Sequence, residues 1–280
     1  MSNLDVETLA RELLSAREMG AMVPAPPSSR PGFDFDLDKA YEVESTLKQW
    51  RVASGHKSVG RKVGYASKAM WRVLKLDTLV WAHMYDDTVH QANGNSATLA
   101  LPRPRSLKIE PEIVFGLKQP IASEAAEAQS ALEATDWLAL GFEIIDCPFP
   151  GWQFQPSDFV ASFGLHAALV IGERTRVNSH MIPKLVDELA QFKVQMFKNG
   201  ELIEEGSGRS CLRSPALCLA ELARATRLRS VVRRFPAEPL TTGEIVSSGT
   251  LTAGHATAAG DQWTAKIDGL SLPPLTFHLT

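Results

Sequence analysis

The pattern of the sequence changes near residue 57, and this change constrains the fold more than any other feature. Before it, apolar residues recur at three- and four-residue steps, which predicts helices over Val6 to about Met19 and Leu37 to about Ala53. After it come short β-type runs broken by glycine and proline, with helices too irregularly interspersed for a doubly wound sheet or an eight-stranded barrel. We therefore predict an α+β fold with an N-terminal helical segment, residues 1–56, and a β-rich domain, residues 57–280.

A hairpin is the most specific local prediction in the β-rich part. The segment FKVQMFKNGELIEEG places Asn199 and Gly200 between two alternating runs. This pair favours a type I′ turn, because both central positions of that turn need a positive φ. A helix is expected to follow, from about Pro215 to Arg227.

The charge balance excludes several partners. The chain has 280 residues, with 29 basic and 32 acidic side chains and a net charge of -3. Such a chain has no general positive field to attract nucleic acid or an anionic membrane surface. We expect no nucleic-acid partner and no membrane partner.

The cysteines and the N-terminus predict a cytoplasmic location. Cys147, Cys211 and Cys218 are odd in number, form no CxxC motif and have apolar neighbours, which favours packing in a reducing compartment over a disulfide framework. The first twenty residues lack a cationic region followed by an apolar one, and no stretch reaches 18 uninterrupted apolar residues.

Two glutamates in the segment IEPEIVF are the first candidates for chemistry. Glu110 and Glu112 are two residues apart in a strand-like run, so their side chains point to the same face. Two neighbouring carboxylates can be compensated by a hard divalent cation such as Mg²⁺. The alternative is a solvated edge strand, which Pro111 favours because it cannot donate a ladder hydrogen bond.

A third carboxylate, Glu143, lies in the almost wholly apolar run WLALGFEIID. The run predicts a buried strand, and a buried carboxylate without a partner is costly. If this strand lies beside that of Glu110 and Glu112, the three carboxylates converge on one cation site. The alternative is an ion pair with an arginine or a lysine, such as Arg103, Arg105 or Lys108.

Two further residues are candidates for catalysis. Lys62 stands between glycines in VGRKVGY, where a lone cation could face a pocket, although lysines usually lie on the surface. Asp87, with Asp86 beside it, follows the apolar run WAHMY and could carry a proton or orient water. An Asp-Asp pair before a turn is also ordinary turn chemistry.

The order and spacing of several segments resemble the fumarylacetoacetate hydrolase superfamily, and within it the 2-keto-4-pentenoate hydratase and 4-oxalocrotonate decarboxylase branch. These segments are GRKVGYASKAM, KIEPEIVF, FEIIDCPFPGW, NGELIEEGSGRSCLRSP and PLTTGEIVSSGTLT followed by GDQWTAKIDGL. The resemblance runs from about Leu9 to the C-terminus.

The resemblance implies a mixed β-roll with N-terminal helices, so that residues 57–280 would be the catalytic domain, and it implies assembly into homo-oligomers. It also implies that Glu110, Glu112 and Glu143 hold Mg²⁺ or Mn²⁺. Lys62 matches the active-site lysine of these proteins, and Asp87 matches their aspartate in the segment after the SKAM helix.

One segment departs from the family pattern. Hydratases of the family usually carry Ala-Asp-Asn where this chain has Ala161-Ser162-Phe163, with His166 close by, and Ser247 and Ser248 stand where more apolar residues are expected. This corner should touch the substrate or the groups that orient the metal ligands. We therefore take Ser162, His166 and Ser248 as candidate substrate-binding residues.

The implied activity is a metal-dependent hydratase that adds water to a 2-hydroxy-2,4-dienoate, or to the corresponding 2-oxo-alkenoate, in the catabolism of aromatic compounds. A small 2-oxo acid would be the substrate. Two alternatives stay open: a hydrolase or decarboxylase of a related keto acid, whose chemistry needs the same electron sink, and a catalytically inactive partner subunit.

Overall fold

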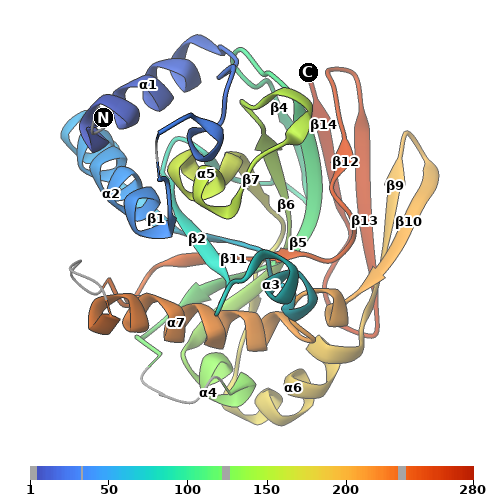
Figure 1. Cartoon of the computed structure of the whole chain (residues 1–280). Coiled ribbons are helices and arrows are strands. Elements are labelled where there is room, and N and C mark those ends of the chain that lie inside the picture. Colours follow the sequence, from blue (N-terminus) through green and yellow to red (C-terminus); the bar gives the residue numbers. More distant parts are fainter. Residues whose placement is uncertain (1–4, 33, 122–126, 233–237) are drawn as a thin grey trace.

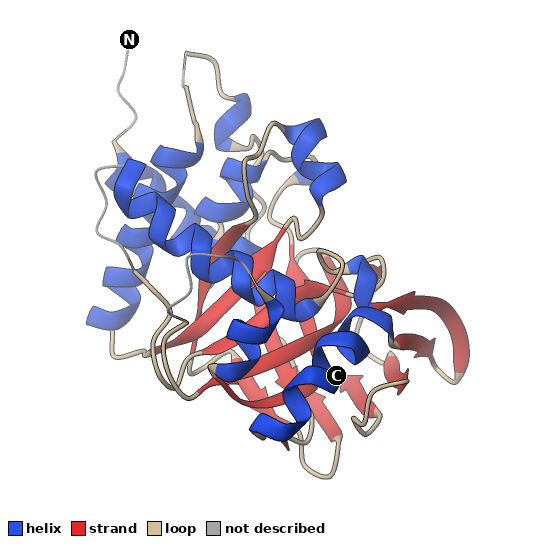
Figure 2. Ribbon diagram, turned by 90° about the horizontal axis from the view of Figure 1, so that it is seen from below, coloured by secondary structure: helices blue, strands red, loops and turns tan. Residues whose placement is uncertain are grey.

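The computed structural model describes residues 5–32, 34–121, 127–232 and 238–280, and for residues 228–232 it describes the backbone alone. The larger of two β-sheets lies at the centre of the molecule, with helices on its flanks, and the smaller sheet lies at one edge (Figures 1 and 2). None of the helices within the described residues is long and apolar enough to cross a membrane.

Two helices form the N-terminal part, as the apolar spacing predicts. Helix α1 covers Val6–Met19 and ends at Gly20, whose φ of 65° closes the helix. Helix α2 covers Leu37–Ala53, and the side chain of Asp36 accepts hydrogen bonds from the first backbone N–H groups of this helix. The predicted bounds of both helices are confirmed.

The larger sheet is mixed and carries the long strands of the molecule. Its strands, in sheet order, are β2 (Val80–Tyr85), β1 (Ser58–Gly64), β11 (Ile245–Thr250), β5 (Leu107–Leu117), β6 (Thr135–Asp146), β7 (His166–Ile171) and β3 (Val89–Gln91), and the short strands β12 (His255–Ala256) and β8 (Thr175–Arg176) pair with β5 and β6. The β1–β11 and β3–β7 pairs are parallel, and the other pairs are antiparallel. Strand β11 therefore joins two strands that come much earlier in the chain.

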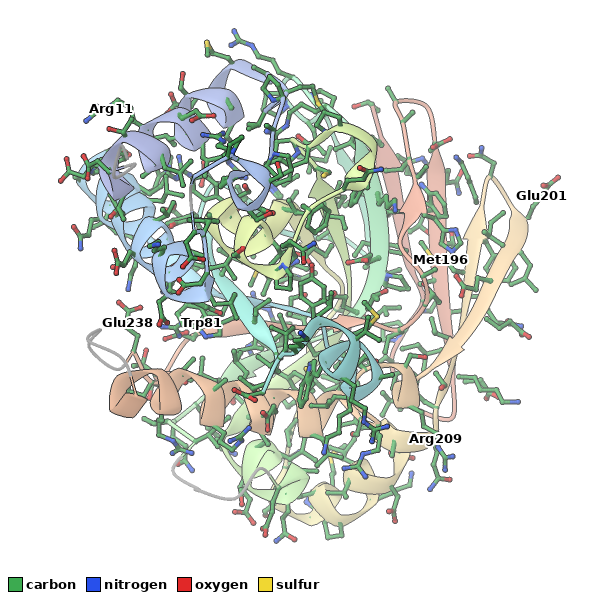
Figure 3. The ribbon with its side chains drawn as sticks, in the orientation of Figure 1. Arg11, Trp81, Met196, Glu201, Arg209 and Glu238 are labelled. Atoms are coloured by element: carbon green, nitrogen blue, oxygen red, sulfur yellow. The ribbon has the colours of Figure 1, made fainter. Side chains whose placement is uncertain are left out.

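The smaller sheet contains the predicted hairpin. Its order is β10 (Glu201–Ser207), β9 (Lys193–Lys198), β13 (Gln262–Asp268), β14 (Leu275–Leu279) and β4 (Ser96–Leu99). Asn199 and Gly200 connect β9 to β10 and both have a positive φ, so the hairpin prediction is confirmed. Its tip projects from the molecule, where Glu201 is exposed, whereas Met196 on β9 is buried (Figure 3).

Further helices cover the sheets. They are α3 (Lys68–Leu74), α4 (Ala128–Glu133), α5 (Pro156–Ala161), α6 (Ile182–Gln191) and α7 (Pro215–Val232), and the 3₁₀ turns are Pro27–Ser29, Pro150–Trp152, Phe163–Leu165, Ser179–Met181 and Gly208–Ser210. Helix α7 extends past Arg227, the predicted end, because the residues that follow contain no glycine or proline before Val232 and are compatible with a helix.

The described residues share one large hydrophobic core. Leu9 of α1 and Val43 of α2 belong to the same buried cluster as Phe115 of β5 and Phe142 of β6. A second, smaller buried cluster includes Val114 and Leu169 on the larger sheet. The main core thus joins the N-terminal helices to the sheets, and the division of the chain into residues 1–56 and 57–280 stays a prediction. The three cysteines are free and buried, consistent with the predicted packing role.

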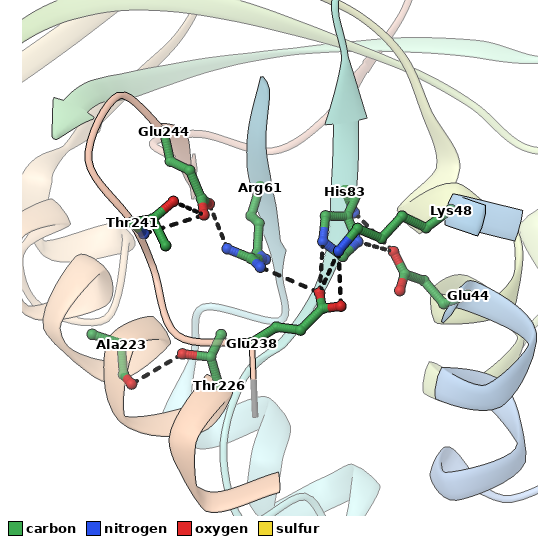
Figure 4. A network of polar contacts seen from close by, with 9 residues as sticks. All are labelled: Glu44, Lys48, Arg61, His83, Ala223, Thr226, Glu238, Thr241 and Glu244. Carbon is green, nitrogen blue, oxygen red and sulfur yellow. Dashed lines mark hydrogen bonds and ion pairs between the residues drawn. The ribbon is translucent and has the colours of Figure 1, made fainter. Parts of the chain in front are cut away.

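A cluster of charged side chains ties the segment after α7 to the N-terminal half (Figure 4). The carboxylate of Glu238 lies 2.8 Å from Lys48 Nζ on α2, 3.4 Å from Arg61 Nη2 on β1 and 3.1 Å from His83 Nε2 on β2. His83 Nδ1 in turn lies 2.5 Å from Glu44 Oε1. Arg61 and His83 are buried, as is Glu44. Glu238 therefore compensates the positive charge of Arg61 and of protonated His83, which have little access to water.

Replacing Glu238 with glutamine should lower the free energy of unfolding by about 2 kcal/mol near neutral pH, because it removes one of two counter-charges from each of two buried groups: Arg61 keeps only Glu244, and His83 keeps only Glu44, among the described residues. The contacts with His83 and Lys48 hold the pKa of Glu238 well below its ordinary value, although burial opposes them. Burial disfavours a charged His83, but Glu44 and Glu238 outweigh burial and raise the pKa of His83.

The two shifts give the expected pH window. The contribution of Glu238 is present above its ordinary pKa and is lost as the pH falls toward its folded value. The contribution of His83 is present below its ordinary pKa and is lost as the pH rises through its folded value. The difference between the native protein and Glu238→Gln should thus be largest between about pH 5 and 6 in urea unfolding. Glu201→Gln is the matched control and should show no difference; equal stability of Glu238→Gln across this window would contradict the argument.

Candidate metal centre and active site

The pairing of β5 with β6 brings three carboxylates together. In the antiparallel register Glu110 lies directly opposite Glu143, and Glu112 is two residues farther along β5 on the same face. One carboxylate oxygen from each of the three residues lies within 4.8 Å of the other two. The structure therefore brings the three acidic residues that the sequence singled out into one cluster.

Glu112 is fully buried and held by the strand on the other side of β5. Ser247 Oγ and the backbone N–H of Gly249, both on β11, donate to Glu112 Oε2, the latter at 3.0 Å. Gly249 has a φ of 103°, a conformation that glycine adopts without strain. Glu112 Oε1, in contrast, has no hydrogen-bond partner among the described residues.

Glu143 is also fully buried, and two cationic or protonatable groups compensate its charge. Lys62 Nζ lies 2.9 Å from Glu143 Oε2, and His166 Nδ1 lies 2.9 Å from Glu143 Oε1. His166 Nε2 contacts Thr88 Oγ1 at 3.1 Å, which fixes the ring. Lys62 is itself buried, so it is not the surface lysine that its residue type alone would favour.

Glu143 thus forms an ion pair with a lysine, as the alternative predicts, but the partner is Lys62 and none of the three residues given as examples. Arg105 pairs with Asp146 at 2.8 Å, and Arg103 donates to a backbone carbonyl of α1. Lys108 lies over the ring of Trp152. Asp146 is the last residue of β6 and lies where Arg105 reaches it, whereas Glu143 lies deeper in the sheet.

The electrostatics of the cluster favour bound protons in the metal-free protein. Burial, opposed by Lys62 and reinforced by Glu143, raises the pKa of Glu110 to about 7. Burial and the neighbouring carboxylates raise the pKa of Glu112 well above its ordinary value. For Glu143, Lys62 and His166 outweigh burial and lower the pKa. A divalent cation would reverse this pattern, because its charge stabilises all three carboxylates.

The donor set fits a hard cation. Three carboxylate oxygens converge, and carboxylates are the ligands that Mg²⁺ and Mn²⁺ prefer. No group of the described residues satisfies the unpaired oxygen of Glu112, and a cation would supply the missing partner. A Cβ atom at Gly254 would lie 2.8 Å from Glu110 Oε1, so glycine at this position leaves room around the carboxylate.

A pocket of about 490 Å³ opens beside the cluster. Lys62 and Glu110 line it, and Lys108 lies farther along the same wall as Glu110. Several aromatic side chains complete the lining, namely Tyr65, Trp152, Phe154 and Phe159. The pocket thus combines a charged wall with aromatic surface that can pack against a carbon chain.

The family follows from comparison with known proteins. A family model described as fumarylacetoacetate (FAA) hydrolase C-terminal matches residues 58–275, well over half of the chain. The chain belongs to the fumarylacetoacetate hydrolase family. The resemblance stated from the sequence is therefore confirmed.

Relatives within this family are similar over most of the chain. A 2-hydroxyhexa-2,4-dienoate hydratase from Comamonas testosteroni is 27% identical over 275 residues, which are 97% of this chain and 97% of that protein. A 4-oxalocrotonate decarboxylase from Pseudomonas sp. (strain CF600) is 28% identical over 237 residues, which are 85% of this chain and 84% of that protein.

A solved structure establishes the fold of this family member. The 4-oxalocrotonate decarboxylase from Pseudomonas putida G7, complexed with magnesium and adipate, superposes with a TM-score of 0.85 at 23% sequence identity. The match covers 100% of this chain and 99% of that one. The predicted mixed α+β architecture, with a curled sheet and N-terminal helices, is confirmed.

Asp87 lies away from the pocket. It sits in the turn between β2 and β3, is exposed, and contacts Arg51 Nη2 on α2 at 2.6 Å. It lines a different pocket, which Arg17 and Arg105 also line. The structure brings Lys62 to the carboxylates but does not bring Asp87 there, because the turn that follows β2 carries Asp87 toward α2 and not toward β5 and β6.

The three candidate substrate-binding residues are buried behind the pocket, and none of them is among its described lining residues. His166 contacts Glu143, because the pairing of β6 with β7 places it next to Ile145, close to that carboxylate. Ser162 Oγ and Ser248 Oγ have no hydrogen-bond partner among the described residues. Their expected contact with substrate therefore gains no support from this geometry.

Sequence reasoning missed some residues that build the site. Gly249 donates to Glu112, and Thr88 orients His166, and the sequence analysis singled out neither residue. Ser247 stood out only as a departure from the family pattern, and its hydrogen bond to Glu112 was not expected. The aromatic residues of the pocket gave no signal by spacing, because they come from separate segments.

Proposed function

We propose that this member of the fumarylacetoacetate hydrolase family is a metal-dependent hydratase that adds water to a 2-hydroxy-2,4-dienoate, or to its 2-oxo-alkenoate tautomer, in the catabolism of aromatic compounds. The observation that carries the proposal is the cluster of Glu110, Glu112 and Glu143 within 4.8 Å, beside a pocket that Lys62 also lines. The near full-length similarity to a 2-hydroxyhexa-2,4-dienoate hydratase supports this reaction class.

The proposed cofactor is Mg²⁺ or Mn²⁺, held by Glu110, Glu112 and Glu143. The convergent carboxylates support it, as does the magnesium in the solved decarboxylase of the same fold. A bound dication would polarise the C2 oxygen of a 2-oxo acid and stabilise the negative charge that develops there.

Lys62 supplies the positive charge that an anionic substrate needs. Three carboxylates and one dication leave a net negative site, which would repel the carboxylate of a 2-oxo acid. Lys62 Nζ, 2.9 Å from Glu143, offsets that charge from within the pocket wall. His166 holds Glu143 from the other side and keeps its orientation fixed. Aromatic side chains line part of the rest of the pocket.

Decarboxylation of a related 2-oxo acid is the second candidate. The similarity to the 4-oxalocrotonate decarboxylase of Pseudomonas sp. (strain CF600) supports it at a comparable identity. Both reactions need the same stabilisation of negative charge on the C2 oxygen, as does hydrolysis of a carbon-carbon bond in a keto acid. The shared requirement explains why residue identities at the cluster do not separate the reactions.

Ultraviolet absorbance and product analysis test the proposal. Purified protein with Mg²⁺ and a 2-hydroxydienoate should remove the dienoate absorbance and yield a hydroxylated keto acid that retains every carbon, and a chelator should stop the reaction. Released CO₂ would identify a decarboxylase, and a cleaved pair of products would identify a hydrolase. Unchanged absorbance with Mg²⁺ and with Mn²⁺ would overturn the enzymatic proposal in favour of an inactive partner subunit.

Two further expectations from the sequence are part of this proposal. We propose that the protein acts in the cytoplasm and assembles into a homo-oligomer. The three free, buried cysteines are consistent with a reducing compartment.

A further inference from the structure

Lys108 lies on the same face of β5 as the two glutamates of the cluster. Residues 108, 110 and 112 alternate along one strand, so their side chains line one wall, with the cation outermost. The rise of a strand places Lys108 about 7 Å from Glu110, measured along β5. Both Lys108 and Glu110 line the pocket of about 490 Å³.

The position of Lys108 is fixed by an aromatic ring. Its Nζ lies 4.1 Å from the centre of the Trp152 ring, within the range of a cation–π contact. Trp152 Nε1 donates to Ser106 Oγ at 2.8 Å, so the ring itself is held. Lys108 is therefore kept at the pocket wall, although a free lysine side chain would extend into water.

No carboxylate among the described residues forms an ion pair with Lys108. The acidic residues near it are otherwise engaged: Asp146 pairs with Arg105, and Glu110 belongs to the carboxylate cluster. Lys108 thus presents a half-buried positive charge, with no carboxylate of the described residues in ion-pair contact, to a pocket lined elsewhere by aromatic, aliphatic and small residues. A carbon chain alone would need only the aromatic surface.

We propose that Lys108 is a specificity-determining residue that binds a second carboxylate at the far end of the substrate, so that the pocket prefers 2-oxo dicarboxylates to 2-oxo monocarboxylates. The inference rests on the proposed function, because it requires the 2-oxo acid end of the substrate to lie at Glu110, Glu112 and Glu143. A short extended carbon chain from that end then reaches Lys108 along the strand.

Calorimetric titration with two oxo acids of equal carbon number tests this inference without turnover. In the presence of Mg²⁺, the native protein should bind 2-oxohexanedioate about tenfold more tightly than 2-oxohexanoate, the size of one charge-assisted contact. Lys108→Met should reduce that ratio to near one and leave the affinity for 2-oxohexanoate unchanged. Lys108→Arg, which keeps the charge, should retain most of the preference.

Lys118→Met is the matched control, because Lys118 directly follows the same strand but is exposed and lies outside the pocket lining. It should behave like the native protein. Equal affinity of the native protein for the two acids, or a preference that persists in Lys108→Met, would overturn the role of Lys108 and leave the proposed function standing. Binding of neither acid with Mg²⁺ would overturn the proposed function and this inference together.

Discussion

Replacing Glu112 with glutamine should lower metal-dependent turnover by on the order of a hundredfold or more. Removal of a residue that only hydrogen-bonds a metal ligand already lowers metal affinity or activity by about 10- to 100-fold, and Glu112 is proposed to be a ligand itself. Glu112 Oε1 is buried and has no hydrogen-bond partner among the described residues, so it is the oxygen most in need of a cation. Glutamine keeps the shape and can still accept the hydrogen bonds of Ser247 and Gly249. The loss should therefore come from the ligand charge and not from misfolding.

Thermal unfolding with and without Mg²⁺ separates the two causes. The native protein should gain stability with Mg²⁺, and Glu112→Gln should lose most of that gain. Without metal the variant should be at least as stable as the native protein at neutral and alkaline pH. Because the pKa of Glu112 is raised, the native protein loses stability as the pH rises from the ordinary glutamate pKa toward the raised value, and glutamine removes this penalty.

Glu201→Gln, on the exposed hairpin tip, is the control for this experiment and should keep both the turnover and the Mg²⁺-dependent stabilisation of the native protein. A Glu112→Gln variant with full activity and an unchanged response to Mg²⁺ would remove Glu112 from the proposed ligand set.

Replacing Lys62 with methionine should lower the free energy of unfolding of the metal-free protein by about 3 kcal/mol, the cost of breaking a buried ion pair by removing one partner. Lys62 and Glu143 are both buried, and their charged atoms lie 2.9 Å apart. Without Lys62, Glu143 keeps only His166 as a partner. Added Mg²⁺ should recover much of the lost stability, because the cation replaces the missing positive charge next to Glu143.

The same variant should raise KM and lower kcat together, with kcat/KM falling by on the order of a hundredfold, if Lys62 offsets charge both in substrate binding and in the transition state. Urea unfolding with and without Mg²⁺, followed by steady-state kinetics, measures both effects. Lys118→Met should change neither. Native stability and native kinetics in Lys62→Met would show that the ion pair contributes to neither process.

Local rules predicted much of the secondary structure. The caps Asp36 and Gly20 lie where the sequence places the helix ends, and the Asn199-Gly200 turn closes its hairpin as expected. These features depend on residues a few positions apart, so a single segment is sufficient to predict them. The shared face of Glu110 and Glu112 follows in the same way from the alternation of a strand.

The rest of the site depends on register and on distant contacts. Glu143 faces Glu110 because of the register between β5 and β6. The sequence alone did not predict that these two strands are neighbours. The ion pair of Lys62 with Glu143 joins β1 to β6, and no local pattern indicates it. The residue type and family position of Asp87 suggest catalysis, whereas Arg51 on α2 holds it at an exposed turn away from the pocket, so its role stays a prediction.

The place of β11 between β1 and β5 has a consequence for how the chain acquires its native state. On a ribosome, both earlier strands emerge long before Ile245–Thr250 exists to join them. Until then each has a free edge with unpaired N–H and C=O groups, which invites pairing with another nascent chain. Glu112 lacks its donors from β11 during the same interval. The carboxylate cluster therefore reaches its native arrangement only late in synthesis. A chain truncated before β11 should aggregate and should not form a shorter active protein.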